Sequence, residues 1–187
     1  YYPCRTVHYT KEFVIDDCSG MTFLEFEGVY PNASVYVNGC LAAEHFNGHT
    51  AFLVDLTPFL QEGTNTLKVL VRNGAPSSRW YTGTGIYRDV WLYRSGTVFI
   101  APNGVKVSTL EADDDAAVLA IETTVSNRGN RVETVSLKHR IGEEELLSPV
   151  TLLPNETKAV TSRFTLPCPK RWCLDDPHLY DCHTELV

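Results

Sequence analysis

Apolar and polar residues alternate with a period of two along most of the chain. In the first half, this pattern runs through short segments at 21–29, 34–39, 50–56, 65–73 and 88–94. These segments are rich in Val, Leu, Phe, Tyr and Thr, and turn residues separate them, which is typical of β-strands. No long stretch keeps the 3.6-residue period of an amphipathic helix, so the pattern predicts an all-β protein.

The same alternation continues in the second half of the chain. Further strands are expected at 104–109, 117–127, 131–141, 156–166 and 178–187. Their number and spacing match a small two-sheet sandwich of the immunoglobulin kind. The longer, more aromatic strands of the first half are typical of a jelly roll. The expected fold is therefore a jelly-roll β-sandwich followed by an immunoglobulin-like β-sandwich.

A domain boundary is expected at the turn residues Ala101–Gly104, because the aromatic content falls sharply after them. This divides the chain into a jelly-roll domain at 1–103 and an immunoglobulin-like domain at 104–187. Within the first domain, Asn38-Gly39 predicts a tight hairpin turn, since both residues tolerate positive φ angles. Thr57-Pro58 predicts one short helical turn with Thr57 as its N-cap.

Length and charge exclude several classes of protein. The chain has 187 residues and a formal net charge of −7 at pH 7, which argues against nucleic acid or anionic lipid as a partner. No apolar run approaches the roughly 20 residues that a membrane helix needs. The first residues lack a signal-peptide pattern, and the last stop inside an alternating strand pattern. We therefore expect a piece of a longer protein with both ends cut, cytoplasmic rather than secreted.

Six cysteines are scattered over the chain and do not resemble a disulfide scaffold. A zinc site is a minor possibility, because structural zinc sites place paired ligands two to four residues apart. Its ligands would come from Cys168, Cys173, His178, Cys182 and His183. Free thiols are favoured, and we expect neither a metal nor a cofactor.

The sequence lacks the motifs of serine hydrolases, phosphate-binding loops and zinc proteases. Acidic runs at 113–115 and 143–145 stand beside turn residues, where carboxylates are normally solvated. His45 and His49 flank an Asn-Gly pair on a loop, which is more typical of surface histidines than of metal ligands. None of these residues predicts a catalytic centre.

The segment 77–92 is unusual, because it places aromatic residues, glycines and arginines between two strands. Aromatic faces stack on sugar rings, and arginine and hydroxyl groups bind sugar hydroxyls. In a purely structural interpretation, Trp80 and Tyr87 close the end of the sandwich while Arg88 pairs with a buried carboxylate. Composition alone leaves both interpretations open.

Three stretches carry a resemblance to a known family: Phe26–Gly39, Phe52–Asn65 and Arg79–Leu92, the last of which reads RWYTGTGIYRDVWL. In this order they resemble the accessory domains of glycoside hydrolase family 2. A weaker match continues through Trp172 and Asp176–Tyr180. The resemblance therefore covers nearly the whole chain.

The resemblance implies a jelly-roll sugar-binding domain and an immunoglobulin-like sandwich, the pair that precedes a catalytic (β/α)8 barrel in these enzymes. Such a barrel needs about 250 residues by itself and carries the family's catalytic glutamates, so no catalytic residue is assigned here. By the same resemblance, Arg79, Trp80 and Tyr81 lie next to the substrate. Arg88 and Asp89 are expected to be structural, since they stand at a strand start and are aimed at packing.

The RWYTGTGIYR form resembles β-galactosidases most closely. It implies a non-catalytic N-terminal fragment of an enzyme that hydrolyses terminal β-galactosides with retention. Its partners would be a carbohydrate substrate, bound through the full-length enzyme, and the catalytic barrel of the same chain. β-Glucuronidase and β-mannosidase share this architecture. A free-standing carbohydrate-binding module and a structural or adhesive pair of β-sandwiches are also compatible with the sequence.

Overall fold

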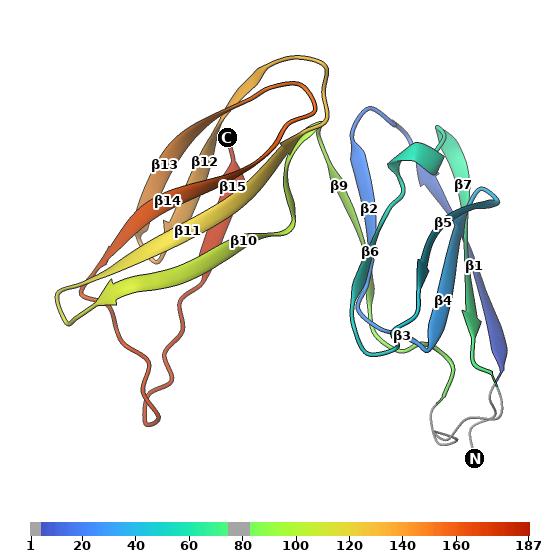
Figure 1. Cartoon of the computed structure of the whole chain (residues 1–187), viewed down its shortest axis with the longest axis horizontal. Helices are drawn as coiled ribbons and strands as arrows, with labels where there is room; N and C mark the ends of the chain where they lie inside the picture. Colours follow the sequence, from blue (N-terminus) through green and yellow to red (C-terminus); the bar gives the residue numbers. More distant parts are fainter. Residues whose placement is uncertain (1–4, 75–82) are drawn as a thin grey trace. The chain divides into compact units, whose positions relative to one another are not determined.

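The structure is a computed structural model that describes residues 5–74 and 83–187. Two compact units divide the chain, and we call Tyr1–Gly96 unit 1 and Thr97–Val187 unit 2. Strands dominate both units, as the alternating sequence pattern predicts (Figure 1). No helix in the described part of the chain is long and apolar enough to cross a membrane.

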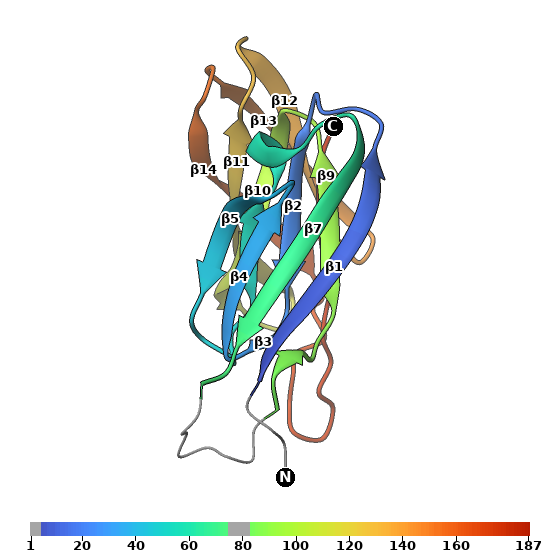
Figure 2. The same cartoon turned by 90° about the vertical axis from the view of Figure 1, so that its right-hand side faces the viewer.

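Unit 1 is a sandwich of two antiparallel sheets, whose larger sheet faces the viewer in Figure 2. In spatial order, that sheet contains β1 (Thr6–Ile15), β7 (Gly63–Arg72), β4 (Asn32–Val37) and β5 (Cys40–His45). The facing sheet contains β6 (Phe52–Asp55), β2 (Met21–Phe26) and β9 (Val90–Ser95). A further short pair joins β3 (Val29–Tyr30) to β8 (Gly85–Ile86).

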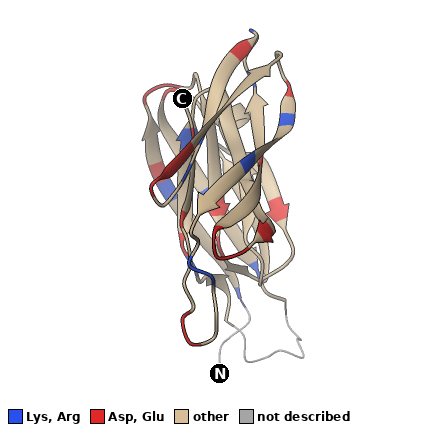
Figure 3. Ribbon diagram, turned by 90° about the vertical axis from the view of Figure 1, so that its left-hand side faces the viewer, with Lys and Arg blue, Asp and Glu red and all other residues tan. Residues whose placement is uncertain are grey.

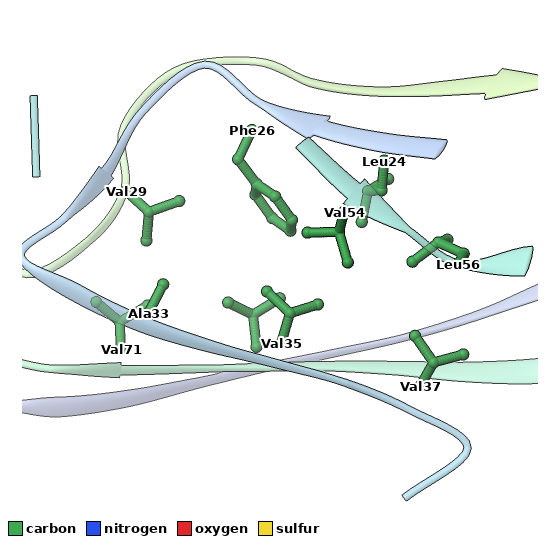
Figure 4. Close-up of a cluster of buried hydrophobic side chains, with 10 residues drawn as sticks. Leu24, Phe26, Val29, Ala33, Val35, Val37, Val54, Leu56 and Val71 are labelled. Carbon is green, nitrogen blue, oxygen red and sulfur yellow. The ribbon is translucent and has the colours of Figure 1, made fainter. Parts of the chain in front are cut away.

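The core of unit 1 fills the space between these sheets. Every second side chain of a strand points to the same face of its sheet. Leu24 and Phe26 of β2 therefore point inward toward Val35 and Val37 of β4 (Figure 4). Phe26, Val35 and Val37 are fully buried. Burial of such side chains contributes roughly 1.5–3 kcal/mol each, which makes this core the main source of the unit's stability.

Unit 2 is a second sandwich, formed by two three-stranded antiparallel sheets. One sheet contains β10 (Val98–Ala112), β11 (Ala116–Asn127) and β14 (Thr157–Pro167). The other contains β13 (Glu144–Leu152), β12 (Glu133–Ile141) and β15 (Cys182–Leu186). The all-β prediction, with a jelly roll followed by an immunoglobulin-like sandwich, is confirmed.

Unit 2 begins before the turn residues at which a boundary is expected. Strand β10 starts at Val98 and is already paired with β11 through Ile100. Its register then shifts between Ile100 and Val105, and Asn103 takes a positive φ of 55°. Pro102, Asn103 and Gly104 therefore form an irregularity inside one strand, where a bulge tolerates such residues. The units divide at Gly96 and Thr97 rather than at 103 and 104.

The two turns predicted in unit 1 are present. Asn38 and Gly39 have φ angles of 50° and 84° and join β4 to β5. The helical turn is a 3-10 helix over Thr57–Phe59, but its N-cap is Leu56 instead of Thr57. The hydroxyl of Thr57 is engaged elsewhere, because it accepts a hydrogen bond from the backbone N–H of Thr22 at 2.9 Å. This bond ties the turn to β2.

A polar layer divides the core of unit 2. Two separate apolar clusters occupy the two ends of the sandwich, around Ile121 and around Val125. On each of five strands, one polar side chain stands between residues of the two clusters. These residues, which we call the polar layer, are Thr123, His139, Ser148, Ser162 and Thr184.

Candidate functional site

The loop residues singled out by the family resemblance, Arg79, Trp80 and Tyr81, lie outside the described residues. Their placement next to a substrate therefore stays a prediction. The chain is described again from Gly83, and the residues that follow line a pocket in unit 1. This pocket is the candidate site.

The pocket has a volume of about 440 Å³, within the usual range of roughly 300–1,000 Å³ for small-molecule sites. Its lining comes from three segments that meet where β3 pairs with β8. We call it the Arg88 pocket. Its described lining residues are Tyr30, His49, Gly83, Thr84, Gly85, Ile86, Tyr87 and Arg88.

Close contacts between glycines and tyrosine rings fix the walls of this pocket. A Cβ atom at Gly28 would lie 2.6 Å from the ring of Tyr87, and one at Gly48 would overlap the ring of Tyr30. Only glycine allows these close approaches without displacing the rings. Both rings therefore rest directly on the backbone of neighbouring segments.

Tyr87 is also held by two hydrogen bonds. Its hydroxyl donates to the carbonyl oxygen of Gly48 at 2.7 Å, and its backbone N–H donates to the carbonyl oxygen of Gly28 at 3.1 Å. The guanidinium carbon of Arg88 lies 5.8 Å from the centre of the Tyr87 ring, which is within cation–π distance. The anchored tyrosine thus supports the arginine.

Arg88 and Asp89 are both exposed, so the structure does not bury them as the packing argument expects. They lie in the short connection between β8 and β9. The backbone carbonyl of Asp89 accepts a hydrogen bond from the backbone N–H of Glu27 at 3.1 Å. Arg88 packs on Tyr87 instead of pairing with a buried carboxylate.

The remaining polar groups of the pocket are hydrogen-bond donors or groups that can act as donors. The rings of Tyr30 and His49 lie 5.4 Å apart in a tilted arrangement. The Thr84 hydroxyl accepts a hydrogen bond from the Asn73 side-chain amide at 3.0 Å, and a hydroxyl can donate as well as accept. Aromatic walls with a few polar groups can hold a sugar ring and its hydroxyls.

The described side of the pocket lacks the groups that glycoside hydrolysis requires. Its eight described lining residues include neither aspartate nor glutamate, whereas retaining hydrolysis uses two carboxyl groups about 5 Å apart. These residues can therefore bind and orient a sugar, but they cannot supply the acid or the nucleophile.

Both acidic runs are exposed, as predicted, but only the first lies on a turn: Glu144 and Glu145 of the second run begin strand β13. Asp113, Asp114 and Asp115 are all exposed, and the backbone N–H groups of Ala116 and Asp115 bind the Asp113 carboxylate and lower its pKa. At the second run, Glu145 forms an ion pair with Lys138 at 3.0 Å. Figure 3 shows acidic and basic positions interspersed rather than gathered into one stripe of either sign.

The described cysteines carry free thiols. Cys18, Cys40, Cys168 and Cys173 are exposed, and Cys182 is half-buried. Within residues 5–74 and 83–187, no three His, Cys, Asp or Glu side chains are placed to hold a metal ion together. The minor possibility of a zinc site therefore receives no support from the described residues.

Tyr30 is a pocket residue that sequence reasoning missed, whereas Thr84 stands in the unusual segment 77–92. The signal for Tyr30 lies in two glycines: Gly28, close to it in the sequence, and Gly48, which its ring contacts in the fold. A glycine inside a strand pattern indicates a close approach of another group. It does not reveal which distant ring makes that approach, because the partners are far apart in sequence.

Both units match models of one protein family. The model described as "Glycosyl hydrolases family 2, sugar binding domain" matches residues 3–96, and the model "Glycosyl hydrolases family 2" matches residues 98–187. The two matched ranges correspond to unit 1 and unit 2.

Known relatives cover nearly the whole chain. Beta-galactosidase BoGH2A of Bacteroides ovatus is 35% identical over 96% of this chain. A putative beta-glucuronidase of Formosa agariphila is 29% identical over 95% of it. The chain spans only 22% and 17% of the lengths of these two relatives.

Solved structures give the same picture. A glycosyl hydrolase family 2 member from Bacteroides cellulosilyticus matches 97% of the chain with a TM-score of 0.89 and 31% identity. A β-glucuronidase from Bacteroides uniformis matches 98% of the chain with a TM-score of 0.86 and 27% identity. The chain covers 26% and 24% of those two chains.

Proposed function

Because the chain belongs to glycoside hydrolase family 2, we propose that it is the non-catalytic N-terminal part of a retaining β-galactosidase. The observation that carries this proposal is the 35% identity to a β-galactosidase across both units. In the whole enzyme, unit 1 and unit 2 would support a catalytic barrel and help to shape the sugar site. The barrel would supply both catalytic carboxyl groups.

The Arg88 pocket supports a role in sugar binding. It combines fixed aromatic walls with the hydroxyl of Thr84, the imidazole of His49 and the guanidinium of Arg88. Such groups orient a sugar by hydrogen bonds and ring contacts without chemistry of their own. These properties fit a unit that binds the sugar while a separate domain of the same enzyme carries out catalysis.

A β-glucuronidase is the second candidate. Relatives from Formosa agariphila and solved structures from Bacteroides uniformis carry that name at 27–29% identity. The higher identity to the β-galactosidase favours the first candidate. A carbohydrate-binding module that acts alone is less favoured, because the chain matches only a part of each of these relatives.

The test uses the full-length protein that contains this chain. Its kcat/KM is measured on aryl β-D-galactoside, β-D-glucuronide and β-D-mannoside. We expect the galactoside to be preferred by at least about 100-fold, which corresponds to roughly 3 kcal/mol of transition-state discrimination. A preference for the glucuronide or the mannoside would replace the β-galactosidase with the corresponding enzyme. Absence of hydrolysis on all three would contradict the proposal altogether.

A further inference from the structure

The charge of the Arg88 pocket is unusual for this chain. The protein carries a formal net charge of −7, yet Arg88 is the one residue of the described pocket lining that is charged at neutral pH. A cation without acidic neighbours on the described walls of its pocket favours an anionic ligand, because no described lining group neutralises its charge.

The surroundings of Arg88 also favour binding of an anion by its guanidinium group. Tyr87 fixes the base on which the guanidinium rests, since its hydroxyl and its backbone N–H are both bound. None of the ion pairs between described residues includes Arg88. A guanidinium presents a planar fork of N–H donors that matches the two oxygens of a carboxylate.

The shape of the site points to a sugar as the carrier of that carboxylate. The volume of about 440 Å³ is far larger than a bare carboxylate needs, and the tyrosine rings supply apolar walls for a ring of carbon atoms. The imidazole of His49 and the hydroxyl of Thr84 lie on the same lining and suit sugar hydroxyls.

We propose that the Arg88 pocket binds a saccharide unit that bears a carboxylate, such as a uronic acid residue, and that Arg88 receives the carboxylate. The inference rests on the proposed function as part of a glycosidase. It concerns a binding site on unit 1 and is independent of which glycosidic bond the barrel would cleave. A galactosidase acting on acidic glycans would use it to hold a charged neighbouring sugar.

The test titrates the 187-residue chain with D-galacturonate, D-galactose and acetate while its backbone amide signals are followed by NMR. We expect galacturonate to shift the signals of residues 83–89. Galactose and acetate should each bind at least about tenfold more weakly, since one lacks the charge-assisted hydrogen bonds and the other lacks the sugar ring. If galactose bound as tightly as galacturonate, the carboxylate would not contribute to binding and the proposal would fail. If acetate bound as tightly as galacturonate, the sugar ring would not contribute and the pocket would not be a saccharide site.

Two variants of the same type assign the effect to one residue. Arg88→Gln should abolish the preference for galacturonate, whereas Arg140→Gln, which changes an exposed arginine of unit 2, should leave it unchanged. Arg88→Lys keeps the charge but loses the planar fork and should bind with intermediate strength. A preference that survives Arg88→Gln in a chain with a native-like spectrum would exclude Arg88. The proposed function is tested by the substrate preference of the full-length enzyme, whereas this inference is tested by direct titration of the 187-residue chain, so the two proposals can fail separately.

Discussion

His139 is a titratable side chain inside the polar layer of unit 2. It is fully buried, and its ring nitrogens lie 3.0 Å from the Thr184 hydroxyl and 3.1 Å from the Ser162 hydroxyl. The Ser162 hydroxyl in turn donates to Ser148 at 2.9 Å. A continuous row of hydrogen bonds through His139 thus links side chains of β15, β12, β14 and β13. Desolvation by this burial lowers the pKa of His139 below its ordinary value of 6.5.

The lowered pKa predicts a pH-dependent stability of unit 2. Between the folded pKa and about 6.5, the unfolded chain binds a proton that the folded chain does not hold. The free energy of unfolding should therefore fall as the pH drops below about 6.5, by at most about 1.4 kcal/mol per pH unit. The measurement is the urea midpoint of β12 amide signals at a series of pH values from about 5 to 8.

His139→Gln separates this titration from the general acid sensitivity of the chain. It keeps a side-chain donor and acceptor but cannot titrate, so the slope below about pH 6.5 should become shallower. His183→Gln changes an exposed histidine of β15 and should keep the full slope. If the His139→Gln slope equals that of the unchanged chain, the buried imidazole does not control the acid response.

Trp80 is predicted to contact the substrate, and this prediction rests on the family resemblance alone. Trp80→Ala in the full-length enzyme should lower kcat/KM on its preferred glycoside by roughly tenfold or more, as expected when an aromatic contact to the sugar is lost. Trp172→Ala changes an exposed tryptophan of unit 2 and serves as the matched control. Unchanged kcat and KM in Trp80→Ala would contradict the placement of this loop beside the substrate.

At the scale of elements, β8 depends on one close approach between distant residues. Gly85 has a φ of 138°, and a Cβ atom there would overlap the hydroxyl of Tyr9. The same hydroxyl accepts a hydrogen bond from the Ile86 backbone N–H at 3.2 Å. Strand β1 therefore supports the pair of β3 and β8, and through it the floor of the Arg88 pocket.

A double-mutant cycle tests this dependence. Gly85→Ala should destabilise unit 1 by about 2–4 kcal/mol, from backbone strain and displacement of Tyr9. Tyr9→Phe should cost about 1 kcal/mol for the lost hydrogen bond. In the Tyr9→Phe background, Gly85→Ala should cost less, because the overlapping oxygen is gone. Gly83→Ala has open space around its Cβ and is the control. Simple additivity of the first two changes would contradict the overlap.

The strands predicted from the sequence share a clear alternation of apolar and polar residues. Strands β1, β5 and β13 were not predicted, because their sequences lack a clear alternation for physical reasons. Strand β1 places Lys11 and Glu12 at its centre because it is an edge strand with exposed positions on both faces. Strand β13 contains Pro149, which a strand interior does not tolerate but an edge strand does. Strand β5 is short and mostly Ala, Leu and polar residues. Edge strands thus limit prediction by alternation.

The candidate site was predictable only in part. Arg88 and Tyr87 stand in a segment whose composition marks it as unusual. Their partners across the pocket, Tyr30 and His49, come from segments far away in sequence. Pairing of β3 with β8 brings Tyr30 beside this segment, and two-residue strands carry almost no periodic signal.

For the whole molecule, the division into units decides where the chain can be cut. Each unit has its own apolar core, and a domain with its own core can in principle fold alone. Cutting at the observed division, between Gly96 and Thr97, keeps every residue of β10 with its partner strand β11. We therefore expect residues 97–187 to give a well-dispersed NMR spectrum without unit 1.

Cutting at the boundary expected from the turn residues should have a different result. Residues 104–187 lack Val98, Phe99 and Ile100, which pair with the end of β11. Phe99 is only 7% exposed, and loss of a buried phenylalanine side chain costs about 3–5 kcal/mol. A small domain has a total stability of about 5–15 kcal/mol, so the shorter fragment should unfold at a clearly lower urea concentration than 97–187. Equal urea midpoints for the two fragments would show that residues 98–100 contribute nothing to the stability of unit 2, although they pair with its strand β11.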